Sequence, residues 1–283
     1  MRYDTSLELI DLALREDLAQ GDITSESTVP ADRRATAIML AKQDGVISGL
    51  TTAQTVFTRV DPTVRFEPFV ADGDRVTKGD ALARISGNAR SILAAERTAL
   101  NLIQRLSGIA TITSEYVAQV AGTNALVIDT RKTTPGLRYL EKAAVRHGGG
   151  SNHRFNLGDA VLIKDNHLAA IGGDHPIRDA VTAAKRRAPH TSKIEVEVVD
   201  LAGVREALDA QADIIMLDNM SLDEMREAVS LVDGRALVEA SGGITLATLR
   251  AVAETGVDLI SSGALTHSAP SLDISLDFQL DRT

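Results

Sequence analysis

The chain has 283 residues, 44% of them hydrophobic, no cysteine and a formal net charge of −9, which excludes disulfides, thiolate metal sites and a cysteine nucleophile. Its acidity argues against a nucleic-acid partner, and no apolar run approaches the roughly 20 residues of a membrane helix. With a polar N-terminal region that lacks the apolar core of a signal peptide, the composition predicts a cytoplasmic protein with no membrane partner.

The first part of the chain predicts a small domain rich in strands. Residues 6–19 carry leucine and isoleucine at helical spacing and predict an amphipathic helix. Between residues 35 and 86, short β-like runs are separated by Asp-Gly and Lys-Gly turns, which predicts strands. Residues 72–87 resemble the turn-rich half of a lipoyl-carrier sandwich. They lack the lysine between two methionines that such carriers modify, so a structural role is expected.

A long helix is predicted from Ser91 to Thr113. Its apolar side is followed by a second, polar face at spacings of three and four residues. The polar face consists of Arg97, Asn101, Gln104, Arg105 and Gly108. Both a solvated surface and a binding face are compatible with this pattern.

From Ala125 onward, apolar runs alternate with helical segments. The runs span residues 125–129, 160–164, 193–198, 213–218, 236–240 and 257–261, and the helical segments lie near 176–187, 201–210, 222–232 and 245–254. Such alternation predicts βαβ units around a parallel sheet. Six strands suggest an incomplete α/β barrel, although they do not exclude an open sheet. The tail from Leu272 is too short for another unit and is expected to return to the first domain.

Polar residues follow the predicted strands at the edge where parallel α/β folds build their active sites. In chain order these are Arg131 and Lys132, then Lys164, Glu195 and Glu197, Asp218, the run Glu239-Ala240-Ser241-Gly242-Gly243, and Ser261-Ser262-Gly263. Glu197 and Asp218 are placed to hold Mg²⁺ shared with phosphates. The alternative is that these acids neutralise Lys132 and Lys164 as buried ion pairs. The glycines allow backbone amides to approach a phosphate.

A basic stretch interrupts this acidic chain. Residues 131–164 hold seven lysines and arginines and only two acids, which favours a confined site for a small, multiply charged anion. The cations exceed what one phosphate requires, so a second substrate rich in carboxylates is expected, because arginine binds carboxylates in bidentate pairs. Arg138, Lys142 and Arg146 lie on the intervening helix and are expected at the surface or in an interface.

Six segments in order carry a resemblance to a known family. They are AERTALNLIQRLSGIAT, DTRKTTPGLRYLEKAAVRHGGGSNHRFNLGDAVLIKDNH, IEVEV, IMLDN, VEASGGIT and ISSGALTHS, and together they resemble the quinolinate phosphoribosyltransferases. The resemblance implies an N-terminal α+β sandwich domain, residues 1–108 joined by the tail 270–283, and an incomplete α/β barrel of about seven strands, residues 109–269. It also implies a homodimer with shared active sites, and it leaves further assembly open.

The activity that this resemblance implies is the transfer of phosphoribosyl from phosphoribosyl pyrophosphate to quinolinate. With Mg²⁺ as cofactor, the products are nicotinate mononucleotide, pyrophosphate and CO₂, in NAD biosynthesis. The implied quinolinate-binding residues are Arg97 from the other subunit, Arg131, His153, Arg154 and Lys164. The implied catalytic residues are Lys132, Lys164, Glu197 and Asp218, the last two also binding the metal. The implied phosphate-binding residues are Ser241, Gly242, Gly243, Ser262, Gly263 and His267.

Two alternatives remain at this point. A related protein of the molybdenum-transport type would act on another acceptor, and a non-catalytic barrel would bind a phosphate without turnover. Release of CO₂ from quinolinate in the presence of phosphoribosyl pyrophosphate distinguishes both from the first interpretation.

Overall fold

The computed structural model describes residues 5–279, and their contacts divide into two units. The first unit contains the residues up to 114, residues 133–149 and the residues from 265 onward; the second contains residues 115–132 and 150–264. The sequence-based division assigned residues 133–149 to the barrel domain, whereas their contacts lie with the first unit.

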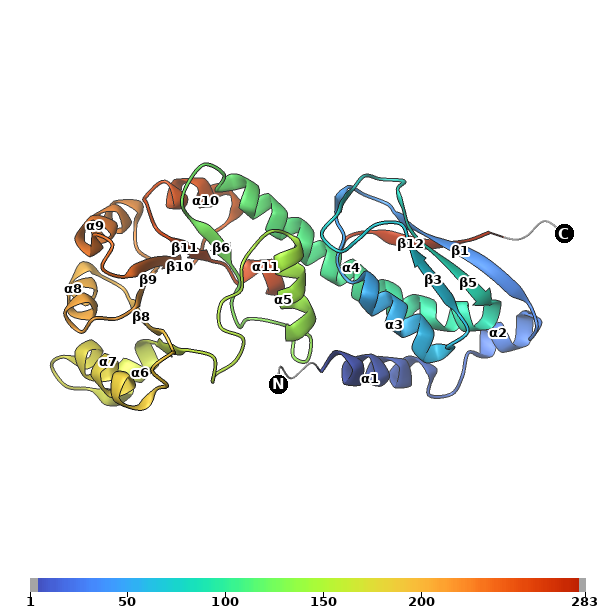
Figure 1. The fold of residues 1–283 in the computed structure, drawn as a ribbon, viewed down its shortest axis with the longest axis horizontal. Coiled ribbons are helices and arrows are strands. Elements are labelled where there is room, and N and C mark those ends of the chain that lie inside the picture. The colour runs from blue at the N-terminus through green and yellow to red at the C-terminus, as the bar shows by residue number, and fades with distance from the viewer. Residues whose placement is uncertain (1–4, 280–283) are drawn as a thin grey trace. The chain divides into compact units, whose positions relative to one another are not determined.

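The first unit is built on an antiparallel sheet of four strands in the order β12-β1-β5-β3 (Figure 1). The strands are β1 (Arg34–Ala41), β3 (Arg65–Pro68), β5 (Ala81–Asn88) and β12 (Ile274–Gln279), and β2 (Gly45–Val46) pairs separately with β4 (Arg75–Val76). Strand β12 runs beside β1 from the pair Thr36 and Gln279 to the pair Ala41 and Ile274. The expected return of the tail to the first domain is therefore confirmed.

The helices of the first unit are more numerous than the sequence patterns predicted. They are α1 (Ser6–Leu18), α2 (Ile23–Thr28), α3 (Leu50–Val60), most of α4 (Ala89–Gln119), α5 (Arg138–His147) and most of α11 (Ala264–His267). The prediction of strands alone between residues 35 and 86 was wrong, because α3 lies among them. Its buried face includes Ala53, Val56 and Phe57, and the carboxylate of Asp72 accepts the first free backbone N–H groups, as an N-terminal cap does.

The polar face of α4 binds the chain's own C-terminal segment. The side-chain amide of Gln104 donates to the carbonyl of Ile274 at 2.7 Å, and the backbone N–H of Leu272 donates to the carbonyl of Gln104 at 3.0 Å. A Cβ at Gly108 would lie 1.9 Å from the carbonyl oxygen of Pro270. Glycine at this position thus permits the close approach, and the face is largely structural.

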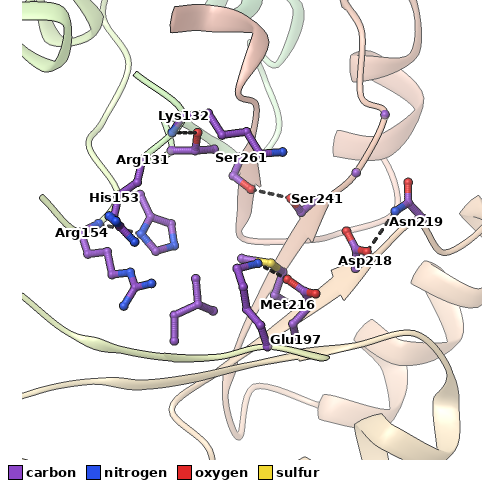
Figure 2. A pocket seen from close by; sticks show the side chains of 15 residues that line it. Arg131, Lys132, His153, Arg154, Glu197, Met216, Asp218, Asn219, Ser241 and Ser261 are labelled. Carbon is purple, nitrogen blue, oxygen red and sulfur yellow. Dashed lines mark hydrogen bonds and ion pairs between the residues drawn. The ribbon is translucent and has the colours of Figure 1, made fainter. Parts of the chain in front are cut away.

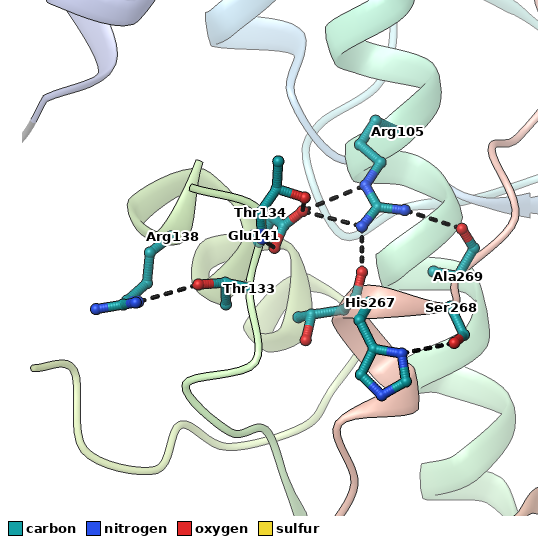
Figure 3. Close-up of polar contacts among 9 residues, drawn as sticks. Arg105, Thr133, Thr134, Arg138, Glu141, His267, Ser268 and Ala269 are labelled. Atoms are coloured by element: carbon teal, nitrogen blue, oxygen red, sulfur yellow. Dashed lines mark hydrogen bonds and ion pairs between the residues drawn. The ribbon is translucent and has the colours of Figure 1, made fainter. Parts of the chain in front are cut away.

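Arg105 on the same helix joins the buried carboxylate of Glu141 on α5, as Figure 3 shows. Glu141 is fully buried and also accepts the backbone N–H and the hydroxyl of Thr134, at 3.0 and 2.8 Å. Arg105 donates in addition to the carbonyls of Thr266 and Ala269. Every oxygen of the carboxylate is therefore satisfied, which a buried ion pair requires.

The basic helix α5 differs from expectation at one position. Lys142 is almost completely buried, so its predicted placement at the surface or in an interface was wrong for this side chain. Arg146 is exposed, and the guanidinium of Arg138 donates to the hydroxyl of Thr133. The stem of a lysine is apolar enough to pack in a core when its ammonium reaches a polar group, which the charge pattern alone does not reveal.

The second unit is an incomplete α/β barrel. Its six parallel strands are β6 (Leu126–Ile128), β7 (Val161–Ile163), β8 (Ile194–Val198), β9 (Ile214–Asp218), β10 (Leu237–Ser241) and β11 (Leu259–Ser261), in the order β6-β11-β10-β9-β8-β7. Helices α7 (Pro176–Arg187), α8 (Leu201–Asp209), α9 (Leu222–Val232) and α10 (Leu246–Ala253) lie outside the strands, and α6 (Asp165–Ile171) follows β7 (Figure 1). The strands and these four outer helices match the predicted βαβ pattern.

The barrel is open between β6 and β7. Within residues 5–279 the parallel sheet has six strands, as the apolar runs predicted, rather than the seven that the resemblance implied. An isolated bridge from Ser151 to Ile128 extends the β6 edge. In the part of the chain described, no helix is both long and apolar enough to cross a bilayer.

Candidate active site

A pocket of about 610 Å³ lies at the carboxyl ends of the barrel strands, the usual place for an active site in this fold. All of its lining residues belong to the second unit, and Figure 2 shows the main ones. They are Thr130, Arg131, Lys132, His153, Arg154, Leu162, Lys164, Glu197, Met216, Asp218, Asn219, Ser241, Gly242, Gly243 and Ser261. Ten of the site residues predicted from the sequence are thus brought together.

One side of the pocket is cationic. The buried Nε atoms of Arg131 and Arg154 have no hydrogen-bond partner within the described residues. Burial lowers the pKa of Arg154, the charge of Arg131 lowers it further, and Glu195 opposes the shift. Two guanidinium groups held near each other with unsatisfied donors are suited to bind carboxylates.

Asp129 fixes the loop that carries His153 and Arg154. Its carboxylate is fully buried at the end of β6 and accepts the backbone N–H of His153 at 2.8 Å and the side-chain amide of Asn152 at 2.6 Å. Its own backbone N–H donates to the carbonyl of Ser151. The acid at the end of an apolar run was visible in the sequence, but its partners were not.

The other side of the pocket is acidic. Glu197 on β8 forms an ion pair with Lys164, which occupies the N-cap position of α6, and Asp218 ends β9 beside Asn219. Part of the ion-pair alternative is therefore present, since Glu197 does pair with Lys164. Both carboxylates nevertheless line the pocket. Their oxygens match the donor set of Mg²⁺, which commonly takes one or two protein carboxylates and completes its shell with phosphates.

The loop after β10 is shaped for a close approach of backbone. Gly242 and Gly243 have positive φ angles, of 89° and 59°, and a Cβ at Gly242 would lie 2.4 Å from the side-chain oxygen of Asn219. The hydroxyl of Ser261 donates to that of Ser241 at 3.0 Å. This glycine loop precedes α10, a typical arrangement for phosphate binding.

Four predicted site residues do not line this pocket. Ser262 is buried and its backbone N–H donates to the carbonyl of Ile128, and Gly263 follows it. His267 is exposed with its Nδ1 atom 2.6 Å from the hydroxyl of Ser268. Arg97 is an exposed residue of α4 in the first unit. Ser261, which the sequence placed at a strand end but which was given no binding role, lines the pocket instead.

A buried cluster lies beside the cationic side of the pocket. The Nε2 atom of His153 is 3.0 Å from Glu195 Oε2 and 3.8 Å from Glu239 Oε2, and the three side chains are 10%, 4% and 1% exposed. Burial raises the pKa of Glu239 to about 8, and the neighbouring charge of Glu195 adds to the shift. The sequence placed Glu239 at a strand end, in the run LVEAS, but did not predict its contact with Glu195 and His153.

Comparison with known proteins gives concordant matches along the chain. The sequence model described as "Quinolinate phosphoribosyl transferase, C-terminal domain" matches residues 109–277, and that of the N-terminal domain matches residues 22–107. A probable nicotinate-nucleotide pyrophosphorylase [carboxylating] of Bacillus subtilis is 45% identical over 96% of this chain and 93% of its own length. A mitochondrial quinolinate phosphoribosyltransferase [decarboxylating] of Nicotiana tabacum is 44% identical over 97% of this chain and 82% of its own.

A solved structure agrees with these relatives. The crystal structure of NadC from Streptococcus pyogenes superimposes with a TM-score of 0.91 at 45% identity and covers 96% of each chain. Both the fold and the sequence are therefore similar over nearly the full length.

Proposed function

The chain belongs to the quinolinate phosphoribosyltransferase family, and we propose from this that it transfers phosphoribosyl from phosphoribosyl pyrophosphate to quinolinate with loss of CO₂. The products are nicotinate mononucleotide, pyrophosphate and CO₂, a step of NAD biosynthesis. The observation that supports this most directly is that Arg131 and Arg154, each with a buried Nε that has no partner among the described residues, line one pocket together with carboxylates and a glycine loop.

The acceptor half of the pocket follows from the charges. Arg131 and Arg154 bind the two quinolinate carboxylates, and Lys164 adds a positive charge at the carboxyl end of β7. Each arginine provides a planar pair of donors that matches a carboxylate. An acceptor with a single carboxylate would leave one guanidinium desolvated and unpaired, which is costly, so the pocket favours the dicarboxylate over nicotinate.

The donor half of the pocket stabilises a dissociating sugar phosphate. The glycine loop Ser241-Gly242-Gly243 holds the 5′-phosphate, and Lys132 stabilises the leaving pyrophosphate. As pyrophosphate departs, positive charge develops on the ribose, and the carboxylates of Glu197 and Asp218 stabilise it by fixed electrostatics. The pyridine nitrogen then attacks the anomeric carbon of the ribose. The resulting pyridinium stabilises the electron pair left on the adjacent ring carbon when its bond to the carboxylate breaks and CO₂ leaves, and that carbon then takes a proton from solvent.

We assign Mg²⁺ to Glu197 and Asp218, whose carboxylate oxygens suit a hard cation. When bound, the ion neutralises charge on the pyrophosphate group. Removal of divalent ions with a chelator is expected to abolish turnover, and restoring Mg²⁺ to recover it.

Four further residues belong to the proposal through the family resemblance. Arg97, exposed on α4, contacts quinolinate in the site of a partner subunit, so the active form is a homodimer with shared sites. Ser262, Gly263 and His267 assist at the phosphate end.

The experiment that tests the function is an assay of CO₂ release from quinolinate, with phosphoribosyl pyrophosphate omitted as the control. The molybdenum-transport and non-catalytic alternatives are not favoured by the relatives found.

A further inference from the structure

Both ring nitrogens of His153 are occupied by groups of the protein itself. The backbone N–H of Arg154 donates to Nδ1 at 2.6 Å, and Nε2 lies 3.0 Å from the carboxylate of Glu195. A backbone N–H can only donate, so Nδ1 is the unprotonated nitrogen. Nε2 therefore carries the proton and donates a hydrogen bond to the carboxylate of Glu195.

This arrangement fixes the charge of His153 as well as its tautomer. A doubly protonated imidazolium would direct an N–H at Nδ1 against the N–H of Arg154, which is repulsive. Metal binding conflicts with the same geometry. His153, Glu195 and Glu239 are the one group of three metal-ligating side chains found among residues 5–279, but a protonated Nε2 has no lone pair to offer a metal.

The two acids meet in the barrel interior because of strand alternation. Glu195 lies on β8 and Glu239 on β10, with β9 between them, and the layers that fill such barrels take side chains from alternate strands. Neither oxygen of Glu239 has a partner of normal hydrogen-bond geometry among the described residues, although Glu195 and Ser261 face it. Glu239 thus lies close to both Glu195 and His153, with its Oε2 atom 3.8 Å from His153 Nε2.

We propose that Glu195 is a positioning residue of the acceptor subsite, which holds His153 as a neutral imidazole with its proton on Nε2, while Glu239 lies beside both side chains. The loop is then fixed at three points: Asp129 holds the backbone N–H of His153, Arg154 holds Nδ1, and Glu195 holds Nε2–H. Since His153 and Arg154 are adjacent in the chain, a fixed ring also fixes the direction of the arginine.

The proposal rests on the proposed function and sharpens its substrate preference. His153 contributes a rigid polar wall and no charge, so recognition of the two carboxylates depends on Arg131, Arg154 and Lys164. A neutral ring also spares the subsite a further cation beside two guanidinium groups that already repel each other.

The first test observes the ring directly and needs no turnover. In protein labelled with ¹⁵N-histidine, long-range ¹H–¹⁵N spectra distinguish the two neutral tautomers from imidazolium, and the His153→Gln variant identifies the signal among the six histidines. We expect His153 to remain the neutral Nε2–H form at neutral pH. An imidazolium or an Nδ1–H form would overturn the proposal, whether or not the enzyme proves active on quinolinate.

The second test separates positioning from simple stability. Glu195→Met removes the acceptor at similar size and is expected to raise KM for quinolinate about tenfold, the effect of one hydrogen bond to a charged group, with KM for phosphoribosyl pyrophosphate changed less than about twofold. Glu195→Gln keeps an acceptor oxygen and should recover most of the loss. Glu227→Met, at an exposed acid of α9, is the control. Equal changes in both KM values, or no recovery with glutamine, would contradict the proposal.

Discussion

The role of each arginine near the pocket depends on whether the protein itself supplies hydrogen-bond partners for its guanidinium group. Arg131 and Arg154 keep buried donors without partners, whereas Arg105, equally basic, is used entirely by Glu141 and two carbonyls. The sequence marked all three as cations on candidate binding faces. Only the fold determines which cation finds a partner inside the protein, because the partners lie between 36 and 164 residues away.

Arg131→Ala is expected to weaken quinolinate binding by about tenfold to a hundredfold, the loss of a hydrogen-bonded charge pair, and to affect phosphoribosyl pyrophosphate much less. Steady-state KM values for both substrates check this. Arg131→Lys is the matched variant, which keeps the charge but loses the planar pair of donors, and should fall between wild type and alanine. An equal loss of binding for both substrates would contradict the assignment of Arg131 to quinolinate.

Glu239 provides a pH dependence of stability. Its pKa is raised to about 8 in the folded protein, against 4.5 as the ordinary value, so the folded state keeps a proton that the unfolded state releases. Stability from this group is complete below about pH 4.5 and is lost as pH rises toward 8. The neighbours that affect this pKa are Glu195, His153 and Ser261, and the Glu239→Gln substitution leaves all three side chains in place.

The Glu239→Gln variant should therefore gain stability relative to wild type as pH rises. We expect the difference in the free energy of unfolding to shift in its favour by about 1 kcal/mol or more between pH 5 and pH 8. Urea unfolding of both proteins at the two pH values measures it. A difference that stays constant with pH would show that Glu239 is ionised in the folded protein.

At the scale of elements, periodicity predicted the barrel well and the first unit less well. The apolar runs of the second unit are continuous because parallel strands are covered on both faces, so their positions differ from the observed strands by only a few residues. Helix α3 was missed because it lies within a region dominated by turn residues and short β-like runs. Helix α6 was read as the polar end of a strand, since Lys164 and His167 both suggested a site rather than a helix cap.

Glycine 108 tests the structural interpretation of the α4 polar face. In Gly108→Ala the added Cβ would meet the carbonyl of Pro270 at 1.9 Å, so the C-terminal segment must move and β12 with it. We expect a loss of about 2 to 3 kcal/mol, typical of overpacking, despite the better helix propensity of alanine. Asn101→Ala, at an exposed position of the same helix, should change stability by less than about 0.5 kcal/mol. Equal stability of both variants in chemical unfolding would refute the close contact.

For the molecule as a whole, the sequence motifs identified the family before any coordinates, and the comparisons confirm it. Composition and periodicity alone reached only an α/β barrel with a cationic site. They could not reach the buried layer of Glu195 and Glu239, because which acids meet inside a barrel depends on register between strands that are not adjacent in the sheet.

The proposed shared sites predict complementation between subunits. Arg97→Ala and Arg131→Ala homodimers should each be nearly inactive. Mixing them under conditions of subunit exchange should restore up to about a quarter of wild-type activity, because half of the dimers are mixed and each contains one intact site. Activity that stays at the level of the single variants after exchange would place the whole site within one chain.

The central claim is tested most directly by the stoichiometry of the reaction. With quinolinate labelled in the carboxylate that is lost, the protein should release labelled CO₂ and pyrophosphate in equal amounts, only when phosphoribosyl pyrophosphate and Mg²⁺ are both present. Folded protein that binds both substrates but releases no CO₂ would contradict the account.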